Sequence, residues 1–183
     1  MKKLFLQSCC APCLSGVWDK IGGEFLVTAN FFNPNIEPKE EWQKRLDSFV
    51  ALTSKLNIKN IIVNNYQAEN QKWRKFVEKF KDEKEGGLRC QKCIRFRLEQ
   101  TAKQAKKDGF DIFGTTLTIS PRKNADAVNK IGRELAEKYQ IEFLEANFKK
   151  QNGYLKSIEL SKKYNLYRQT YCGCQYSKNQ KPV

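Results

Sequence analysis

Ser8-Cys9-Cys10-Ala11-Pro12-Cys13 holds three of the seven cysteines of this chain and stands where a strand is expected to pass into a helix. The apolar run Leu4-Phe5-Leu6 directly before it predicts a short buried strand. Pro12 suits the first turn of a helix, because the N–H that proline lacks has no partner there. The free N–H groups and the positive dipole end at such a junction favour thiolates and anionic clusters.

Outward from this junction, segments rich in β-branched and aromatic residues alternate with segments whose apolar residues recur at helical spacing. The expected strands span 3–8, 24–32, 60–64, 110–116 and 141–146. The expected helices span 12–21, 39–56, 70–80, 90–107, 121–139 and 153–164, the fifth capped by Ser120. This alternation predicts a single catalytic α/β domain over 1–183, with a mostly parallel sheet of about five strands and helices on both faces, Rossmann-like or nucleotide-hydrolase-like.

The site is expected at the carboxyl ends of the strands, where open α/β folds bind their ligands. Cys9 and Cys10 follow the first strand, Asn33 follows the second, and the hydroxyl-rich stretch 115–120 follows the fourth. Residues 166–183 are expected to form an irregular tail that carries Cys172-Gly173-Cys174 over the active site. These segments should therefore meet at one edge of the sheet.

The charge balance predicts a polyanionic partner. Lys and Arg total 34 against 20 Asp and Glu, a net charge of +14, which favours nucleic acid, although a lysine-rich solvated surface is the plainer alternative. The chain has no histidine, so the commonest general base and metal ligand is missing. Any metal must then be held by thiolate, carboxylate, water or substrate.

The cysteine count indicates metal or redox chemistry. No apolar run approaches the roughly 20 residues that span a bilayer, and the start of the chain is too polar for a signal peptide, so no membrane contact and a cytoplasmic location are expected. In that compartment seven cysteines argue against a framework of structural disulfides.

Two pairs of cysteines together offer four thiolates. Cys90 and Cys93 stand three residues apart at the start of a helix, so both thiols should lie on one face. With Cys9 and Cys10 they reach the number usual for an iron–sulfur cluster. Zinc also accepts four thiolates, but structural zinc usually takes two spaced pairs. The spacing favours iron–sulfur and leaves zinc open.

Cys172-Gly173-Cys174 is a different pattern. Two cysteines separated by one residue can close only a small, strained ring, and strained disulfides are the labile, catalytic kind. A redox-active pair is therefore the functional interpretation, with unlinked thiols or an alternative metal pair as the other possibilities. Cys13 is left over, as a core thiol or a further metal or redox group.

Basic and aromatic side chains interleave around these cysteines, a combination that suits phosphates and splayed bases of RNA. A solvated basic face with packed tyrosines is the plainer interpretation, and some of the hydroxyls are expected to cap a helix. The candidates for binding RNA or substrate are Arg89, Arg97, Thr115, Thr116, Arg122, Lys123, Arg168, Tyr171 and Tyr176.

Several stretches spread over nearly the whole chain resemble one family. They are Cys9-Cys10-Ala11-Pro12-Cys13, Asn33-Pro34-Asn35-Ile36-Glu37-Pro38, Glu85-Gly86-Gly87-Leu88-Arg89-Cys90 with Cys93 and Arg97-Leu98, Thr115-Thr116-Leu117-Thr118-Ile119-Ser120-Pro121, and Tyr167-Arg168-Gln169 leading to Tyr171-Cys172-Gly173-Cys174-Gln175-Tyr176-Ser177. Their combination is similar to the cobalamin-independent epoxyqueuosine reductases, the QueH family. One departure is Gln7, which stands where that family commonly has a histidine. A histidine there is therefore not essential to the chemistry of this protein, provided that it is active.

The resemblance implies the last step of queuosine synthesis at the wobble position of tRNA, in which an epoxide on a cyclopentane ring is reduced to the alkene with loss of water. It implies a [4Fe-4S] cluster on Cys9, Cys10, Cys90 and Cys93 and a redox pair at Cys172 and Cys174. The partners would be the anticodon loop of tRNA and an electron donor that the sequence does not identify. An additional iron, an open cluster iron or a tyrosine would receive the epoxide oxygen.

Two other functions compete with this one. A tRNA sulfur-transfer enzyme can share an α/β fold, a cluster and a basic surface, but it would need a pyrophosphate-binding glycine loop after the first strand. That place holds Cys9-Cys10-Ala11-Pro12. A zinc-stabilised RNA-binding module without catalysis is the other alternative. Iron in the purified protein would distinguish either enzyme from the zinc-stabilised module. Conversion of epoxyqueuosine in tRNA without ATP would distinguish the reductase from the sulfur-transfer enzyme.

Overall fold

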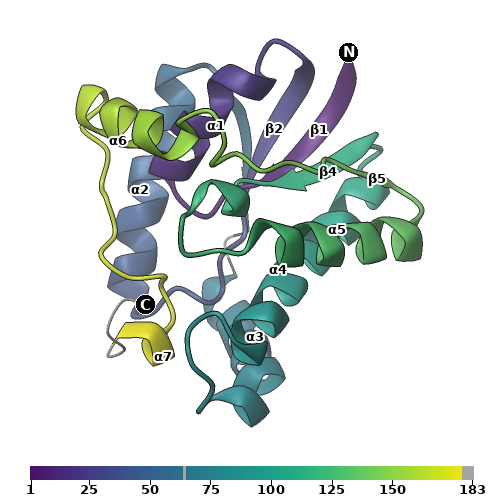
Figure 1. Cartoon of the computed structure of the whole chain (residues 1–183), viewed down its shortest axis with the longest axis vertical. Coiled ribbons are helices and arrows are strands. Elements are labelled where there is room, and N and C mark those ends of the chain that lie inside the picture. Colours follow the sequence, from purple (N-terminus) through teal and green to yellow (C-terminus); the bar gives the residue numbers. More distant parts are fainter. Residues whose placement is uncertain (64, 179–183) are drawn as a thin grey trace.

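The computed structural model describes residues 1–63 and 65–178, whose strands form a single parallel sheet (Figure 1). The strands are β1 (Lys2–Gln7), β2 (Phe25–Phe31), β3 (Lys59–Ile62), β4 (Ile112–Thr115) and β5 (Glu142–Phe143). Their order across the sheet is β3-β2-β1-β4-β5, and every neighbouring pair is parallel. This confirms the predicted α/β class and the five-stranded, doubly covered sheet.

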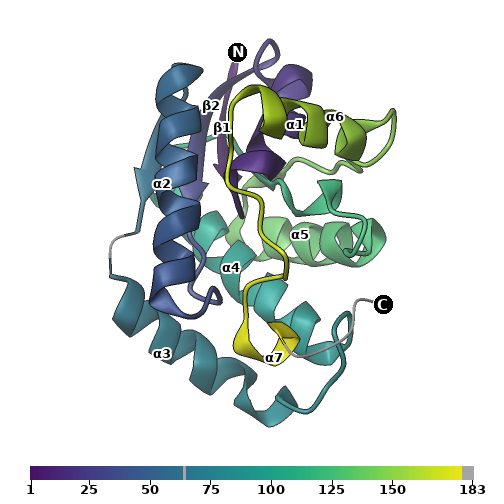
Figure 2. The same cartoon turned by 90° about the vertical axis from the view of Figure 1, so that its left-hand side faces the viewer.

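Helices cover both faces of the sheet (Figures 1 and 2). The helices are α1 (Ala11–Ile21), α2 (Lys39–Lys55), α3 (Tyr66–Val77), α4 (Leu88–Lys107), α5 (Ala125–Tyr139), α6 (Gly153–Lys163) and α7 (Gln175–Lys178), with short 3-10 turns η1 (Glu78–Phe80) and η2 (Leu117–Ile119). Within the described residues, no helix has the length and apolar character needed to cross a membrane.

The alternation of side chains along β1 explains the two hydrophobic cores. Leu4 and Leu6 point to one face and pack in a cluster with residues of α1 and α2, including Leu14 and Phe49. Phe5, between them, points to the other face and packs with residues of α4 and α5. Because successive strand residues face opposite sides, a continuous apolar run is what a doubly covered strand requires.

Several element boundaries differ from the prediction. The third helix begins at Tyr66 instead of 70, and the fifth begins at Ala125 instead of 121. Asn124 caps the fifth helix, since its Oδ1 accepts the Ala127 N–H at 3.0 Å. Ser120 was the wrong choice of cap, because its hydroxyl instead accepts the Arg122 N–H in the preceding loop.

The last strand and the tail also differ from expectation. The strand expected over 141–146 pairs with the sheet only at Glu142–Phe143, after which the chain leaves toward α6. The tail is not wholly irregular, because Gln175–Lys178 forms the short helix α7. Residue 64 at the end of the expected third strand, and residues 179–183 of the tail, lie outside the described residues.

The order of the strands places a crevice beside β1. The chain moves outward from β1 through β2 to β3 and then returns to β4 on the other side, so the order reverses between β1 and β4. The carboxyl ends of β1 and β4 stay joined, since the Thr116 N–H donates to Gln7 O at 3.0 Å. Ligands of open α/β folds bind at this kind of reversal.

Candidate active site

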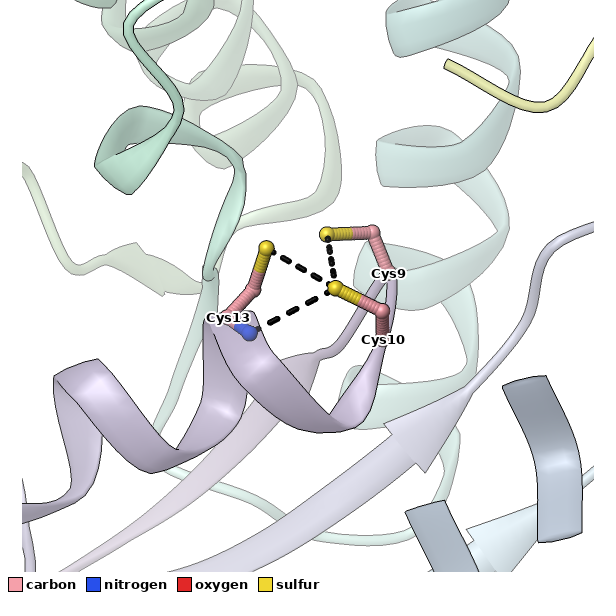
Figure 3. A group of neighbouring side chains, drawn as sticks. All are labelled: Cys9, Cys10 and Cys13. Atoms are coloured by element: carbon pink, nitrogen blue, oxygen red, sulfur yellow. Dashed lines mark hydrogen bonds between the residues drawn. The ribbon is translucent and has the colours of Figure 1, made fainter. Parts of the chain in front are cut away.

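Three thiols gather where β1 ends and α1 begins (Figure 3). Cys10 caps α1 and its Sγ lies 3.8 Å from Cys9 Sγ and 2.9 Å from Cys13 Sγ. The Cys13 N–H also donates to Cys10 Sγ at 3.4 Å, as a residue in the first helical turn does to a cap. All three sulfurs lie within 4.8 Å of one another, close enough to hold one metal ion.

The protons in this group are shared unequally. Hydrogen bonds from Cys10 and Cys13 hold the pKa of Cys9 well below its ordinary value, although burial opposes them. Burial raises the pKa of Cys10 to about 12, and the hydrogen bonds to Cys10 and Cys9 raise that of Cys13. The group therefore favours one thiolate, at Cys9, supported by two thiols. Thiolate is the form that binds soft metals.

The other four cysteines surround a second, smaller cavity. Cys90 and Cys93 come from the start of α4, and Cys172 and Cys174 from the tail; all four line a space of about 10 Å³. Cys93 and Cys174 pack against Trp73 and are almost fully buried. Burial raises the pKa of Cys93, and it raises that of Cys174 to about 11. All seven cysteines are free thiols.

Arg97 lies between the two groups of cysteines. Its side chain is 2% exposed and its Nη1 donates to Asn33 Oδ1 at 3.5 Å. Burial opposes the charge of the guanidinium, but the neighbouring Cys93 and Cys172, followed by Cys9, raise its pKa. One buried cation thus interacts with thiols of both groups.

Hydrogen-bond donors are in surplus around these thiols. Arg97 Nε and Arg89 Nε and Nη2 are buried with no partner in the described part of the chain. The Trp73 indole donates to Cys93 and so opposes the burial that raises the pKa of that thiol. Buried donors are nearly always paired, so unpaired ones facing thiols indicate an anionic occupant. A thiolate-bound cluster carries negative charge on its sulfurs and accepts such bonds. The donor set therefore fits an iron–sulfur cluster.

Gln7 joins the ends of three strands. Its Oε1 accepts the Thr115 hydroxyl at 2.8 Å, and its Nε2 donates to Asn33 Oδ1 at 3.0 Å and to Phe32 O at 3.3 Å. Asn33 in turn donates to Ser8 O at 2.8 Å and accepts from Arg97. An amide can donate and accept at once, which is what this position requires. Gln7 thus holds Asn33 in place, and Asn33 in turn positions Arg97.

The main cavity opens over the first cysteine group. It has a volume of about 150 Å³, with Cys9 and Cys13 in its lining and Arg122, Tyr154 and Arg168 around it. Arg122 and Arg168 are exposed. A cavity of about this volume admits a benzene ring in another protein, so a five-membered ring fits.

The tail is held over this cavity by α2. Arg45, 2% exposed, donates through Nε to Glu41 at 2.8 Å and through its two terminal nitrogens to Cys172 O at 3.0 Å and Tyr171 O at 3.2 Å. The Tyr167 hydroxyl donates to the same Glu41 at 2.7 Å. We call Glu37, Glu41 and Arg45 the tail clasp.

Glu37 completes the tail clasp from the loop before α2. Its N–H donates to Gly173 O at 2.8 Å, its O accepts the Tyr171 hydroxyl, and its carboxylate accepts the Gln175 N–H at 3.3 Å. Gly173 has a φ of +132°, and a Cβ there would come within 3.1 Å of Arg45 and Ile36. Only glycine suits this position.

Four of the predicted RNA or substrate contacts, Arg89, Arg97, Thr115 and Thr116, are nearly fully buried, and their contact with the substrate stays a prediction. Arg97 also lies in the lining of the main cavity. Arg89 donates to Lys81 O at 2.9 Å and to Glu83 O, at the start of α4. Thr116 contacts Cys9, accepting its N–H at 3.4 Å. The two guanidinium groups lie beside the thiols, and the two hydroxyls form hydrogen bonds at the ends of the strands.

The remaining candidates lie at or near the cavity. Arg122, Arg168 and half-buried Tyr171 line it, as does Lys123, which is buried and ion-paired with Glu85 at 3.5 Å. Tyr176 instead packs against Trp73 and lies under the Arg89 guanidinium. Sequence reasoning missed Glu37, Glu41 and Arg45 of the tail clasp, together with Tyr154 and Gln169. Of these, Glu37 and Gln169 had a signal, because both stand in stretches that carry the family resemblance.

Comparison with known proteins finds one family. Residues 4–180 match the family described as "Epoxyqueuosine reductase QueH". A protein of that name from Staphylococcus epidermidis is 38% identical over 180 residues, covering 96% of this chain and 76% of the relative. One from Thermotoga maritima is 38% identical over 179 residues, covering 97% and 91%, and one from Haemophilus influenzae is 37% identical over 179 residues, covering 96% and 71%.

Proposed function

This chain belongs to the epoxyqueuosine reductase QueH family, and we propose that it reduces the epoxide of epoxyqueuosine in tRNA to the alkene of queuosine. It is an oxidoreductase that modifies tRNA. Together with the family match over 4–180, the feature that carries this proposal is the ring-sized cavity lined by Cys9, Cys13 and Cys172. Free thiols beside this cavity can supply electrons and protons to an epoxide on a ring bound there.

The reaction needs two electrons and two protons for each epoxide that becomes an alkene and water. Oxidation of two thiols to a disulfide releases that number of both. We assign this role to Cys172 and Cys174, of which Cys172 lines both cavities. An electron donor must then return the pair to thiols. A strained ring through one glycine is easily reduced, which suits repeated turnover.

The cofactor is proposed to be a [4Fe-4S] cluster on Cys9, Cys10, Cys90 and Cys93. Bound there, it would supply electrons one at a time. The unpaired donors of Arg89 and Arg97 support an anionic group between the two pairs. Cys13 lies close enough to Cys10 to compete as a ligand, and Cys172 and Cys174 share a cavity with Cys90 and Cys93.

The exposed cations beside the cavity suit the substrate's backbone. Arg122 and Arg168 would bind phosphates of the anticodon loop, while the modified ring enters the cavity. Tyr154 and Tyr171 offer aromatic faces beside the same space, as single-stranded RNA sites commonly do.

The activity is tested with anaerobically purified protein, a chemical reductant and tRNA that carries epoxyqueuosine, without ATP. Mass spectrometry of the digested nucleosides should show loss of one oxygen atom. Protein that contains iron but leaves the epoxide unchanged would contradict the function. Insertion of sulfur that depends on ATP would favour the sulfur-transfer alternative, and protein that contains zinc and no iron would favour the RNA-binding module.

The ligands are tested by changing each cysteine to serine and measuring iron. Cys9, Cys10, Cys90 and Cys93 variants should lose iron or hold a labile cluster, with Cys13→Ser affected less. The double variant of Cys172 and Cys174 should keep iron and tRNA affinity but lose turnover with the physiological donor. Loss of iron in that double variant would reassign the tail pair as ligands. More than four irons per chain in the wild type would reveal the additional iron.

A further inference from the structure

Cys172 and Cys174, the tail pair, lie in different surroundings. Cys172 is half-buried and lines both the main cavity and the smaller one. Cys174 is 7% exposed, packs against Trp73, and of the two cavities lines the smaller one alone. A ring bound in the main cavity can therefore meet Cys172 but not Cys174.

Two cations mark the position of the Cys172 sulfur. Lys123 donates a hydrogen bond to this side chain, and the charge of Arg97 interacts with it. Both cations line the two cavities, as Cys172 does. The sulfur therefore lies at the boundary between the space for the ring and the space that holds Cys174. A fixed cation beside a thiol favours the thiolate, which is the nucleophilic form.

The tail clasp holds the backbone of the pair in place. Arg45 donates to Cys172 O at 3.0 Å, and the Glu37 N–H donates to Gly173 O at 2.8 Å. Gly173, with a φ of +132°, turns the chain between the two cysteines. The two side chains still interact electrostatically across this turn. The pair is thus held with one sulfur toward the main cavity and the other behind it.

Two further thiols, Cys9 and Cys13, line the main cavity. Cys9 is a proposed ligand of the cluster, and Cys13 Sγ lies 2.9 Å from the sulfur of Cys10, another proposed ligand. Within this lining, Cys172 is the thiol whose nearest cysteine in the sequence, Cys174, has no metal assigned to it. Cys172 can therefore react at a ring and then pair with a second thiol.

We infer that Cys172 forms a covalent bond to the ring of the substrate and that Cys174 resolves it, an inference that rests on the proposed function. The Cys172 thiolate attacks one epoxide carbon, and the bond from that carbon to oxygen breaks. The oxygen takes the proton that Cys172 gave up. Attack from the back leaves sulfur and oxygen on opposite faces of the ring, which is the anti arrangement that elimination needs.

The second step consumes this adduct. The Cys174 thiolate attacks the Cys172 sulfur, so that the S–S bond forms and the S–C bond breaks. The electron pair of the S–C bond becomes the second bond of the alkene as hydroxide leaves, and hydroxide takes the Cys174 proton to become water. The two thiols have then supplied the two electrons and two protons of the reaction. The electron donor returns the disulfide to thiols.

Removal of the resolving thiol should trap the adduct. Cys174→Ser and Cys174→Ala, incubated anaerobically with epoxyqueuosine tRNA, should form a protein–tRNA conjugate that resists denaturation and reducing thiols. Mass spectrometry after nuclease and protease digestion should place the cyclopentane ring on Cys172. Cys172→Ser should form no conjugate. Iron content and thermal melting of each variant, compared with wild type, show whether it is folded.

The inference and the proposed function fail differently in this experiment. If wild type produces queuosine but folded Cys174 variants that bind tRNA form no conjugate, the covalent role is wrong and the function stands. A ring found on any cysteine other than Cys172 would overturn the inference as well. If wild type leaves the epoxide unchanged, the function is wrong.

A test on wild type needs neither the variants nor turnover. Cyclopentene oxide, a bare ring epoxide, should alkylate Cys172 at least about 10-fold faster than Cys174 in the reduced, iron-loaded protein, because one sulfur borders the main cavity and the other lies behind it. Peptide mass spectrometry of timed samples measures both rates in the same protein. Equal rates, or faster labelling of Cys174, would overturn the inference whatever the Cys174 variants do.

Discussion

Arg97 is the side chain whose place links the strand ends to both groups of thiols. Gln7 and Asn33 hold it from the sheet, and it faces Cys9 on one side and Cys93 on the other. A buried cation stabilises whichever state of the centre carries more negative charge, because the surroundings screen it weakly. The reduced centre is that state, so Arg97 should raise its reduction potential.

The effect of replacing the Arg97 cation should be measurable as a change in reduction potential, without an assay of turnover. Arg97→Met is expected to lower the midpoint potential of the iron centre by about 60 mV or more, which corresponds to ~1.4 kcal/mol for one electron. Arg97→Lys should recover part of the shift. Potentiometric titration followed by visible absorption measures it. Arg95→Met, two residues away in a partly exposed pair with Glu134, is the control. Equal midpoint potentials in wild type and the three variants would show that Arg97 does not tune the iron centre electrostatically.

At the scale of elements, α2 decides where the tail lies. Arg45 uses three nitrogens on Glu41 and two carbonyls of the tail. Arg45→Met leaves the mostly buried Glu41 carboxylate without its cationic partner, although the Tyr167 hydroxyl still donates to it, and loss of a buried ion-pair partner typically costs about 3–5 kcal/mol. Faster limited proteolysis within 166–178 and faster alkylation of Cys172 should follow. Arg45→Lys should restore little, because an ammonium cannot make the fork of bonds. Arg133→Met, whose ion pair is exposed, should leave the tail protected.

The tail clasp also makes stability depend on pH. Burial, followed by the hydrogen bond to Glu41, raises the pKa of Tyr167 from its ordinary 10.0 to about 12. The folded protein therefore keeps this proton where the unfolded chain has lost it. Its contribution to stability is complete below pH 10 and falls as pH rises from 10 toward 12.

The matched variant for this dependence is Tyr167→Phe, which removes the titrating hydroxyl and keeps the ring. Between pH 10 and 12 the Tm of wild type should fall more steeply than that of Tyr167→Phe, and the two curves should run parallel between pH 7 and 9. Parallel curves over the whole range would mean that the Tyr167 pKa is not raised by folding.

For the whole molecule, the net charge of +14 makes binding of tRNA depend on salt. Each phosphate contact that is lost should reduce the slope of log K against log salt by about 1. Alanine at Arg122 or Arg168 is expected to do so, because both are exposed beside the cavity. Lys107 is a matched control, since the twenty residues of α4 place it about 30 Å from the start of that helix. An affinity for tRNA that does not change between low and physiological salt would contradict an electrostatic contribution to binding.

The sequence by itself determined the alternation of elements and therefore the edge where the site lies. Apolar periodicity, Pro12 and the glycines are local signals, and the parallel sheet that they predict brings the ends of β1, β2 and β4 together without further information. Four helix starts lay within two residues of their predicted places, and the two that differed more, α3 and α5, follow loops in which several polar residues compete as caps.

Only the tertiary structure decided which cysteines meet and which charges are buried. Cys13 joins Cys9 and Cys10 because a helical turn brings it back to the cap, but Cys172 reaches Cys90 only through the packing of the tail against α2. Arg89 and Arg122 are the same residue type in similar basic contexts, yet one is buried and the other exposed. Burial depends on contacts between segments far apart in the chain, and local composition does not encode it.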